Sequence, residues 1–164
     1  MISDKMQDAL NGQINAELYS AYLYLSAAAY FEDTNLTGCA NWMRLQAQEE
    51  VSHAMKIFSH VAERGGRVLL AAIAEPPGEW DSPLAVFQAA YAHEQKVTGM
   101  INDLVAAAAA EGDHAAGVFL QWFVSEQVEE EAAADAIVHK LELVGDSANG
   151  LFLVDREMGQ RQAG

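Results

Sequence analysis

Apolar residues recur at spacings of three and four along most of the chain, the pattern of helices that bury one face. Gly and Pro interrupt this pattern at few places, and the segments between are rich in the helix formers Ala, Leu, Glu and Gln. Residues suited to begin or end helices stand at the interruptions: Ser3, Asp33-Thr34-Asn35, Gly65-Gly66, Ser82-Pro83, Gly112-Asp113, Gly145 and Ser147. The sequence therefore predicts five helices, over about residues 3–32, 36–64, 82–112, 113–145 and 147–158.

The connections between these helices predict their arrangement. Short joints at 33–35 and 112–113 indicate two antiparallel pairs. Residues 65–82 form an 18-residue connection, which reaches roughly 55–60 Å when extended and so spans helices that are ~45 Å long. We expect an all-α, ferritin-like four-helix bundle with one long crossover between helices two and three and a short fifth helix. The chain is predicted to form one domain over 1–164, with the bundle at about 3–145 and the fifth helix at about 147–158.

The predicted buried stripe of each long helix is apolar toward its ends and polar near its middle. On the first helix, for example, Ile14 and Ala21 flank Glu17 on the same stripe. The polar positions of the four stripes, taken in chain order, are Glu17, Gln46, Glu50, His53, Glu94, Gln127 and Glu130.

These polar positions lie at matching heights. Glu17 and Glu50 are about equally distant from the first joint, and Glu94 and Gln127 from a point beside the second. Residues equidistant from the joint of an antiparallel pair lie at one level. A shift of 77 residues also carries one hairpin's set onto the other's: Glu17, Glu50 and His53 onto Glu94, Gln127 and Glu130.

A cluster of carboxylates in a core indicates a metal site. Buried carboxylates without partners are costly, and several together repel one another strongly. No Lys or Arg lies on these stripes, so a pair of divalent cations is the simplest source of positive charge. Glu50 and His53 are three residues apart and share a helix face, as in di-iron bundles. Oxygen and nitrogen ligands suit iron or manganese, and zinc stays open. The alternative is a set of hydrogen-bonded core polar residues.

Composition narrows the choice of partner. The formal charge of −15 argues against nucleic acid and anionic membranes and favours cations. Hydrophobic residues make up 51% of the chain, yet no apolar run approaches the roughly 18 residues of a membrane span. Cys39 is the single cysteine, and the first residues have neither the basic nor the apolar stretch of a signal peptide, so we expect a cytoplasmic protein. Cys39, Met43 and Met55 are interpreted as packing residues, and His60 as a core histidine rather than a ligand.

Several motifs resemble those of prokaryotic non-haem ferritins, across essentially the whole chain. They are 14–17 (INAE), 41–44 (NWMR), 48–54 (QEEVSHA), 63–67 (ERGGR) and 126–131 (EQVEEE). The resemblance implies a homo-oligomeric hollow shell, usually of 24 subunits, with an iron-oxidising centre inside each bundle. The apolar segment 67–73 of the crossover and the short fifth helix favour such assembly, the former as an extended segment packed on a partner.

The resemblance also implies roles for individual residues. Glu17 and His53 bind the first iron, Glu50 bridges, and Glu94 with Glu130 bind the second. Gln127 flanks the second iron, and Tyr24 lies beside the pair, although an ordinary core aromatic is an equal alternative for Tyr24. A third iron site on the cavity side is implied for Glu49, Glu126, Glu129 and Glu130, and a solvated acidic face is the alternative for the first three.

Two departures from related families bear on cofactors. Bacterioferritins have a second Glu-x-x-His where this chain has Gln127 and Glu130, and Val51 stands where their haem-binding methionine would follow the bridging glutamate. We therefore expect no haem. No Cys-x-x-Cys is present, so a rubrerythrin-type electron-transfer domain is not expected either.

The sequence thus predicts a ferroxidase that stores and detoxifies iron by oxidising Fe(II) with O2 or H2O2. A non-cage di-iron or di-manganese oxidase or peroxidase is the main rival, because it would use the same ligands. A metal-free helical interaction module would account for the length and charge but not for the polar stripes.

Overall fold

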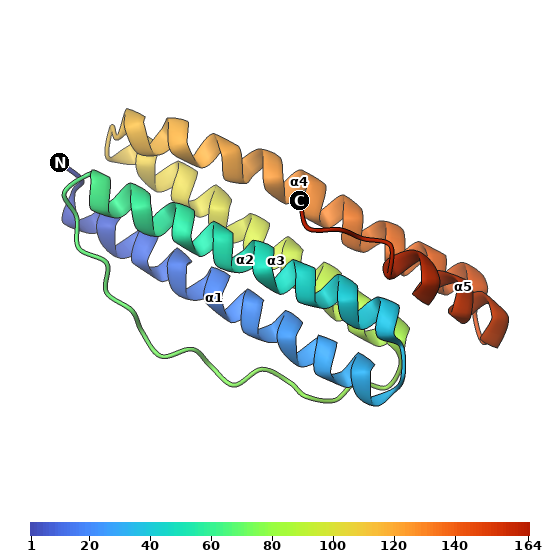
Figure 1. Cartoon of the computed structure of the whole chain (residues 1–164). Coiled ribbons are helices and arrows are strands. Elements are labelled where there is room, and N and C mark those ends of the chain that lie inside the picture. The colour runs from blue at the N-terminus through green and yellow to red at the C-terminus, as the bar shows by residue number, and fades with distance from the viewer.

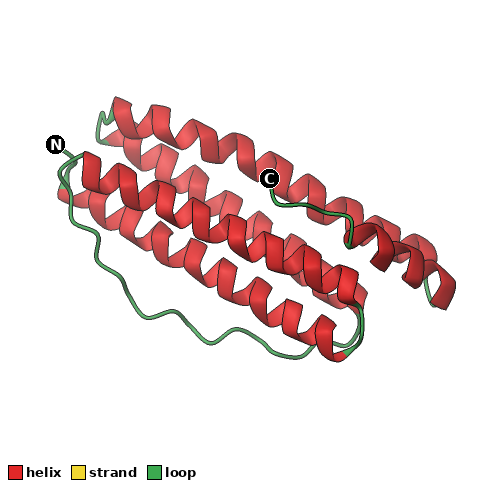
Figure 2. Ribbon diagram, viewed as in Figure 1, coloured by secondary structure: helices red, strands yellow, loops and turns green.

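The computed structural model describes residues 1–164 as five α-helices joined by loops (Figures 1 and 2). The predicted all-α fold, with a short fifth helix after the bundle, is confirmed. The helices are α1 (Asp4–Asp33), α2 (Thr37–Glu63), α3 (Pro83–Ala110), α4 (His114–Val144) and α5 (Ala148–Met158).

The four long helices form two antiparallel hairpins, α1 with α2 and α3 with α4, and these pack side by side (Figure 1). The green segment between α2 and α3 runs the length of the bundle beside α1, so the predicted long crossover is also confirmed (Figure 1). Because this crossover returns the chain to the other end of the bundle, α2 and α3 run parallel and the two hairpins begin at opposite ends (Figure 1). No helix is both long and apolar enough to cross a membrane.

Side-chain caps begin four of the five helices where the sequence places them. Ser3 accepts a hydrogen bond from the Met6 amide, and the other three caps have the same geometry. Such caps satisfy amides that have no partner within the helix. After each of the first three helices, one residue takes the left-handed backbone conformation that turns the chain: Asn35 at φ 59°, Gly65 at 74° and Gly112 at 65°. The remaining caps are Ser82, Asp113 and Ser147.

Polar side chains of α1 hold the crossover in its extended course. Asn11 donates to the Arg67 carbonyl at 3.0 Å and accepts from the Leu69 amide at 3.3 Å. Asn15 donates to the carbonyls of Ala71 and Ala72, at 3.3 and 3.1 Å. The apolar side chains of this segment stay largely exposed on the single subunit, so their packing on a partner remains a prediction.

The core is divided along the bundle axis into two apolar halves. One half surrounds Phe31 and Phe87, and the other surrounds Leu10 and Leu120. Buried polar residues lie between the halves, at the level that the four stripes predict. Cys39 and Met43 are fully buried, as expected, but the prediction for Met55 is wrong because half of its surface is exposed.

The fifth helix packs across the N-terminal end of α2. Val154 and Met158 of α5 are buried there, and the Asp155 carboxylate accepts a hydrogen bond from the Cys39 amide at 2.8 Å. Gly38 makes this contact possible, because a Cβ at that position would stand 1.7 Å from the Asp155 carbonyl oxygen. The close approach fixes where the chain after α5 returns to the bundle.

Candidate metal centre

Five ionisable side chains meet in the middle of the bundle, each almost inaccessible to solvent. Their exposed fractions are 1% for Glu17, 2% for Glu50, 4% for His53, 2% for Glu94 and 6% for Glu130. They come from all four long helices, so the matched heights expected from the two hairpins place them in one region. Burial this complete requires partners for the charges.

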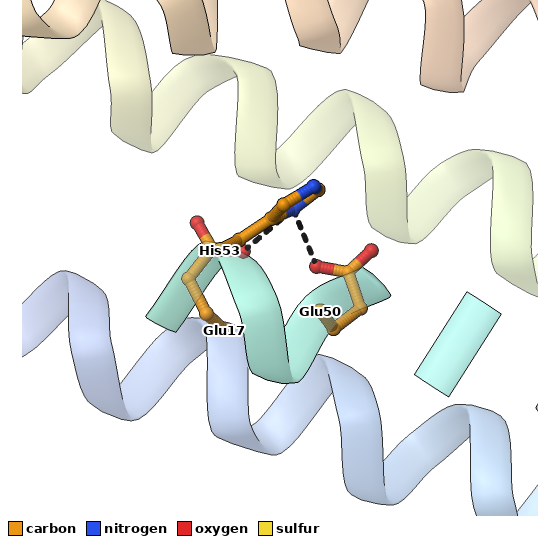
Figure 3. A group of neighbouring side chains, drawn as sticks. All are labelled: Glu17, Glu50 and His53. Atoms are coloured by element: carbon orange, nitrogen blue, oxygen red, sulfur yellow. Dashed lines mark ion pairs between the residues drawn. The ribbon is translucent and has the colours of Figure 1, made fainter. Parts of the chain in front are cut away.

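The first hairpin supplies one group of potential ligands, drawn in Figure 3. Glu17 of α1 and Glu50 and His53 of α2 each offer an atom within 4.8 Å of the others. The His53 Nδ1 atom lies 3.3 Å from the nearer Glu50 carboxylate oxygen and 3.7 Å from that of Glu17. Both carboxylates are thus directed at the same edge of the imidazole, where a cation would be shared.

A second group extends the site toward the other hairpin. Glu50, Glu94 and Glu130 offer oxygen atoms within 4.8 Å of one another. Glu50 belongs to both groups, so its carboxylate lies where it could contact two metal ions. The arrangement has the form of a two-metal site bridged by one carboxylate.

Neutral donors orient these carboxylates. Gln127 donates to the Glu94 carboxylate at 3.1 Å, and Tyr24 donates its hydroxyl to the same carboxylate. Tyr24 therefore directly contacts a potential metal ligand, in addition to packing in the core. Such donors stabilise the ionised carboxylate without adding positive charge.

Two further amide donors have roles that the sequence reasoning missed. Gln13 donates to Glu17 at 2.7 Å, and Gln46 donates to Glu50 at 3.1 Å and to Glu130 at 2.6 Å. Each glutamine lies four residues before a glutamate of its own helix, a spacing that puts the two side chains side by side. This repeated spacing was the available signal.

The protonation of these side chains reflects crowded negative charge in a dry environment. Burial raises the pKa of Glu50 well above its usual range, and the nearby Glu94 and Glu17 charges add to the rise. Burial and the Glu94 charge raise the pKa of Glu130 to about 7. Burial disfavours charged His53, but hydrogen bonds and charge from Glu17 and Glu50 outweigh it and raise its pKa to about 10.

The donor set therefore fits two hard or borderline divalent cations. Four carboxylates and one imidazole are the ligand types of iron, manganese and zinc sites. Because their pKa values are raised, Glu50, Glu130 and His53 hold protons that a binding cation displaces. A site of this kind binds metal and couples the binding to proton release.

A comparison with known proteins identifies the family. The ferritin-like domain matches residues 7–144. The chain belongs to the ferritin family.

Full-length relatives agree with this assignment. The bacterial non-haem ferritin of Bacteroides fragilis strain YCH46 is 45% identical over 161 residues, covering 98% of this chain and 100% of the relative. The bacterial non-haem ferritin of Escherichia coli O157:H7 is 38% identical over 158 residues, covering 96% of each chain. The crystal structure of an open-pore ferritin from Archaeoglobus fulgidus superposes with a TM-score of 0.98 at 58% identity, covering 99% of this chain and 100% of that one.

The residues expected to form a third iron site are not equally placed in this ferritin. Glu126 lies next to the metal centre, since its carboxylate is 3.8 Å from His53 Nε2 and within 4.8 Å of a Glu130 oxygen. Glu49 is instead ion-paired with Arg161, at 2.7 Å. Glu129 is exposed and joins none of the three groups of potential ligands.

His60 lies outside the metal centre of this ferritin, further along α2. Its ring stacks on Phe119 with centroids 3.9 Å apart. Burial lowers its pKa, which favours the neutral ring that such stacking suits. The ring packs as expected, but His60 is only partly buried and its Nε2 atom has no hydrogen-bond partner, so it is not a fully satisfied core histidine.

Proposed function

We propose that this chain is the subunit of an iron-storing ferritin that oxidises Fe(II) inside its own bundle and delivers Fe(III) to the interior of a shell. The observation that carries the proposal is the buried cluster of four carboxylates and one histidine. Glu17 and Glu50 form ion pairs with His53 alone, and the buried Glu17 Oε2 atom has no hydrogen-bond partner. One imidazole thus faces four carboxylates, which is less positive charge than a purely structural network would need.

The residues divide into two positions for iron. Glu17 and His53 bind the first Fe(II), Glu94 and Glu130 bind the second, and Glu50 bridges them. The spacing of potential ligand atoms in both groups supports this division. Each Fe(II) ion gives up one electron, and the two electrons with two protons reduce O2 to H2O2. The carboxylates favour the product, because Fe(III) carries one more charge for the same anionic ligands.

The two positions are unequal, which bears on how product leaves. The first has an imidazole and the second has Gln127, a neutral side chain that contacts Glu94 and cannot add charge. We propose that the second iron is therefore held more loosely and departs first. A third iron position uses Glu126 with Glu130, joined by Glu49 and Glu129 on the inner face, and passes iron toward the cavity.

The oligomeric state and location follow the same proposal. We propose a shell of 24 subunits in the cytoplasm, with the apolar crossover segment 67–73 buried between copies. Leu69, Leu70 and Ile73 are 52%, 68% and 40% exposed on a single subunit. Exposed apolar side chains gathered on one segment mark an interaction surface.

Replacing the bridging residue tests the oxidation centre. Adding Fe(II) aerobically to the Glu50→Ala variant should give slow oxidation, because both metal positions lose a ligand. The matched control is Glu142→Ala, a change to an exposed glutamate of α4, which should oxidise iron at the unaltered rate. If Glu50→Ala oxidised iron as fast as the unaltered protein, the assignment would be wrong.

Size-exclusion chromatography tests the shell separately. Twenty-four copies of a 17.8 kDa chain give a particle of about 430 kDa. A monomer or dimer would rule out the shell and would favour the rival, a di-iron or di-manganese oxidase or peroxidase acting on another substrate.

A further inference from the structure

The chain after α5 returns to the bundle and ends over its middle. Figure 1 shows this dark red tail leaving α5 and running back along the bundle. Arg161 in the tail is packed against α2, with its guanidinium carbon 4.4 Å from the centre of the Trp42 ring and its carbonyl accepting from Asn41 at 3.2 Å. The side chain is therefore held at a defined place although it lies near the C-terminus.

Arg161 is directed toward the metal centre. Its Nη1 donates to the Gln46 side-chain oxygen at 2.9 Å, and its Nη2 donates to the Glu49 carboxylate at 2.7 Å. Gln46 is fully buried and donates in turn to Glu50 and Glu130. One hydrogen-bonded chain therefore joins the tail to two potential iron ligands.

The chemistry of each partner fixes the orientation of the Gln46 amide. A guanidinium has five N–H donors and no acceptor, so only the amide oxygen can face Arg161. The amide nitrogen faces Glu50 and Glu130, which only accept hydrogen bonds when a bound cation keeps them ionised. If Arg161 were absent, only the hydrogen bonds to Glu50 and Glu130 would hold the amide, and the buried amide oxygen would lose its charged partner.

We propose that Arg161 is a positioning residue for the metal centre: it orients Gln46, and Gln46 sets the positions of Glu50 and Glu130. This inference rests on the proposed function, because it requires Glu50 and Glu130 to bind iron. The same guanidinium neutralises Glu49, so a cation on the inner face competes with Arg161 for that carboxylate.

Cobalt(II) titrated anaerobically is the probe, because its visible absorption reports the coordination of each bound ion without oxidation. The Arg161→Gln variant should bind the weaker of the two cobalt ions about fivefold less tightly, with an altered absorption spectrum. Arg161→Lys keeps the charge but lacks the planar fork, so it should restore the spectrum only in part. Arg156→Gln, a change to an exposed arginine of α5, is the control and should leave both readouts unchanged.

A double variant tests whether the effect passes through Gln46. Gln46→Met preserves length and removes the amide, so it should reproduce the shift of Arg161→Gln, and the two changes together should not add. Unchanged affinity and spectrum in Arg161→Gln, or additive effects in the double variant, would overturn the inference. If the unaltered protein bound no pair of cobalt ions, the proposed function itself would fail instead.

Discussion

Gly38→Ala tests how the fifth helix is attached to the bundle. The added Cβ would lie 1.7 Å from the Asp155 carbonyl oxygen and 2.7 Å from its carbon. Ordinary contact begins at 3.4 Å, so the backbone of α5 must move by well over 1 Å. Neither atom belongs to a flexible side chain, and local adjustment cannot remove the overlap.

The energy at stake is the docking energy of α5. Burial of Val154 and Met158 contributes about 1.5–3 kcal/mol each, and the hydrogen bond between Asp155 and the Cys39 amide adds about 1 kcal/mol. The sum of about 4–7 kcal/mol is comparable to the stability of a whole domain. We therefore expect α5, whose Val154 and Met158 belong to the apolar half around Phe31 and Phe87, to detach while the four long helices stay folded.

The single cysteine provides the assay. Cys39 is fully buried, and burial and the neighbouring Asp155 raise the pKa of its thiol, so it should react slowly with a chromogenic disulfide reagent in the unaltered protein. In Gly38→Ala it should react at least tenfold faster, since roughly 1.4 kcal/mol of lost docking already gives that factor.

The matched control is Gly99→Ala. A Cβ at Gly99 in α3 meets nothing within 4 Å, so this change should leave the thiol protected and add up to about 1 kcal/mol of stability. Equal thiol reactivity in Gly38→Ala and the unaltered protein, with equal midpoints of thermal unfolding, would refute the docking argument.

Three further outcomes are expected. Tyr24→Phe removes a donor from the Glu94 carboxylate, so anaerobic cobalt titration should show the weaker site bound about fivefold less tightly, in a protein that remains folded; equal affinity would contradict the contact. Because the pKa of Glu130 is raised to about 7, metal binding should release more protons at pH 6 than at pH 8, and metal affinity should fall as the pH drops below 7. Calorimetry in buffers of different ionisation enthalpy measures the number of protons released. Proton release that does not depend on pH would contradict the prediction. Asp113→Ala removes the cap of α4 and a paired contact with Arg64 at 3.0 and 3.2 Å, so urea unfolding should show a loss of about 2 kcal/mol. A change below about 0.5 kcal/mol, the size of an ordinary surface substitution, would show that neither contact matters.

The sequence predicts the bundle and the height of the metal centre because both depend on local rules. Caps such as Ser82 act on the next helical turn, and an antiparallel pair brings Glu17 and Glu50 to one level wherever the joint is short. The prediction for Met55 failed because it used residue type instead of position. Met55 lies two residues after His53 and so points roughly 200° away from the buried stripe.

The contacts that could not be predicted join distant parts of the chain. Arg161 and Gln46 are separated by 115 positions, and their meeting depends on how closely α5 approaches Gly38. Periodicity locates the buried side of a helix but not the angle at which a following helix packs. The hydrogen bond from Tyr24 to Glu94 likewise depends on the rotation of α1 relative to α3, which spacing alone does not fix.

The division of the core into two apolar halves has a consequence for turnover. Ions enter and leave a polar layer that neither half needs for its own cohesion, so emptying the layer removes no apolar contact above or below it. The subunit can therefore bind and release iron repeatedly while the apolar packing at both ends of the bundle stays unchanged.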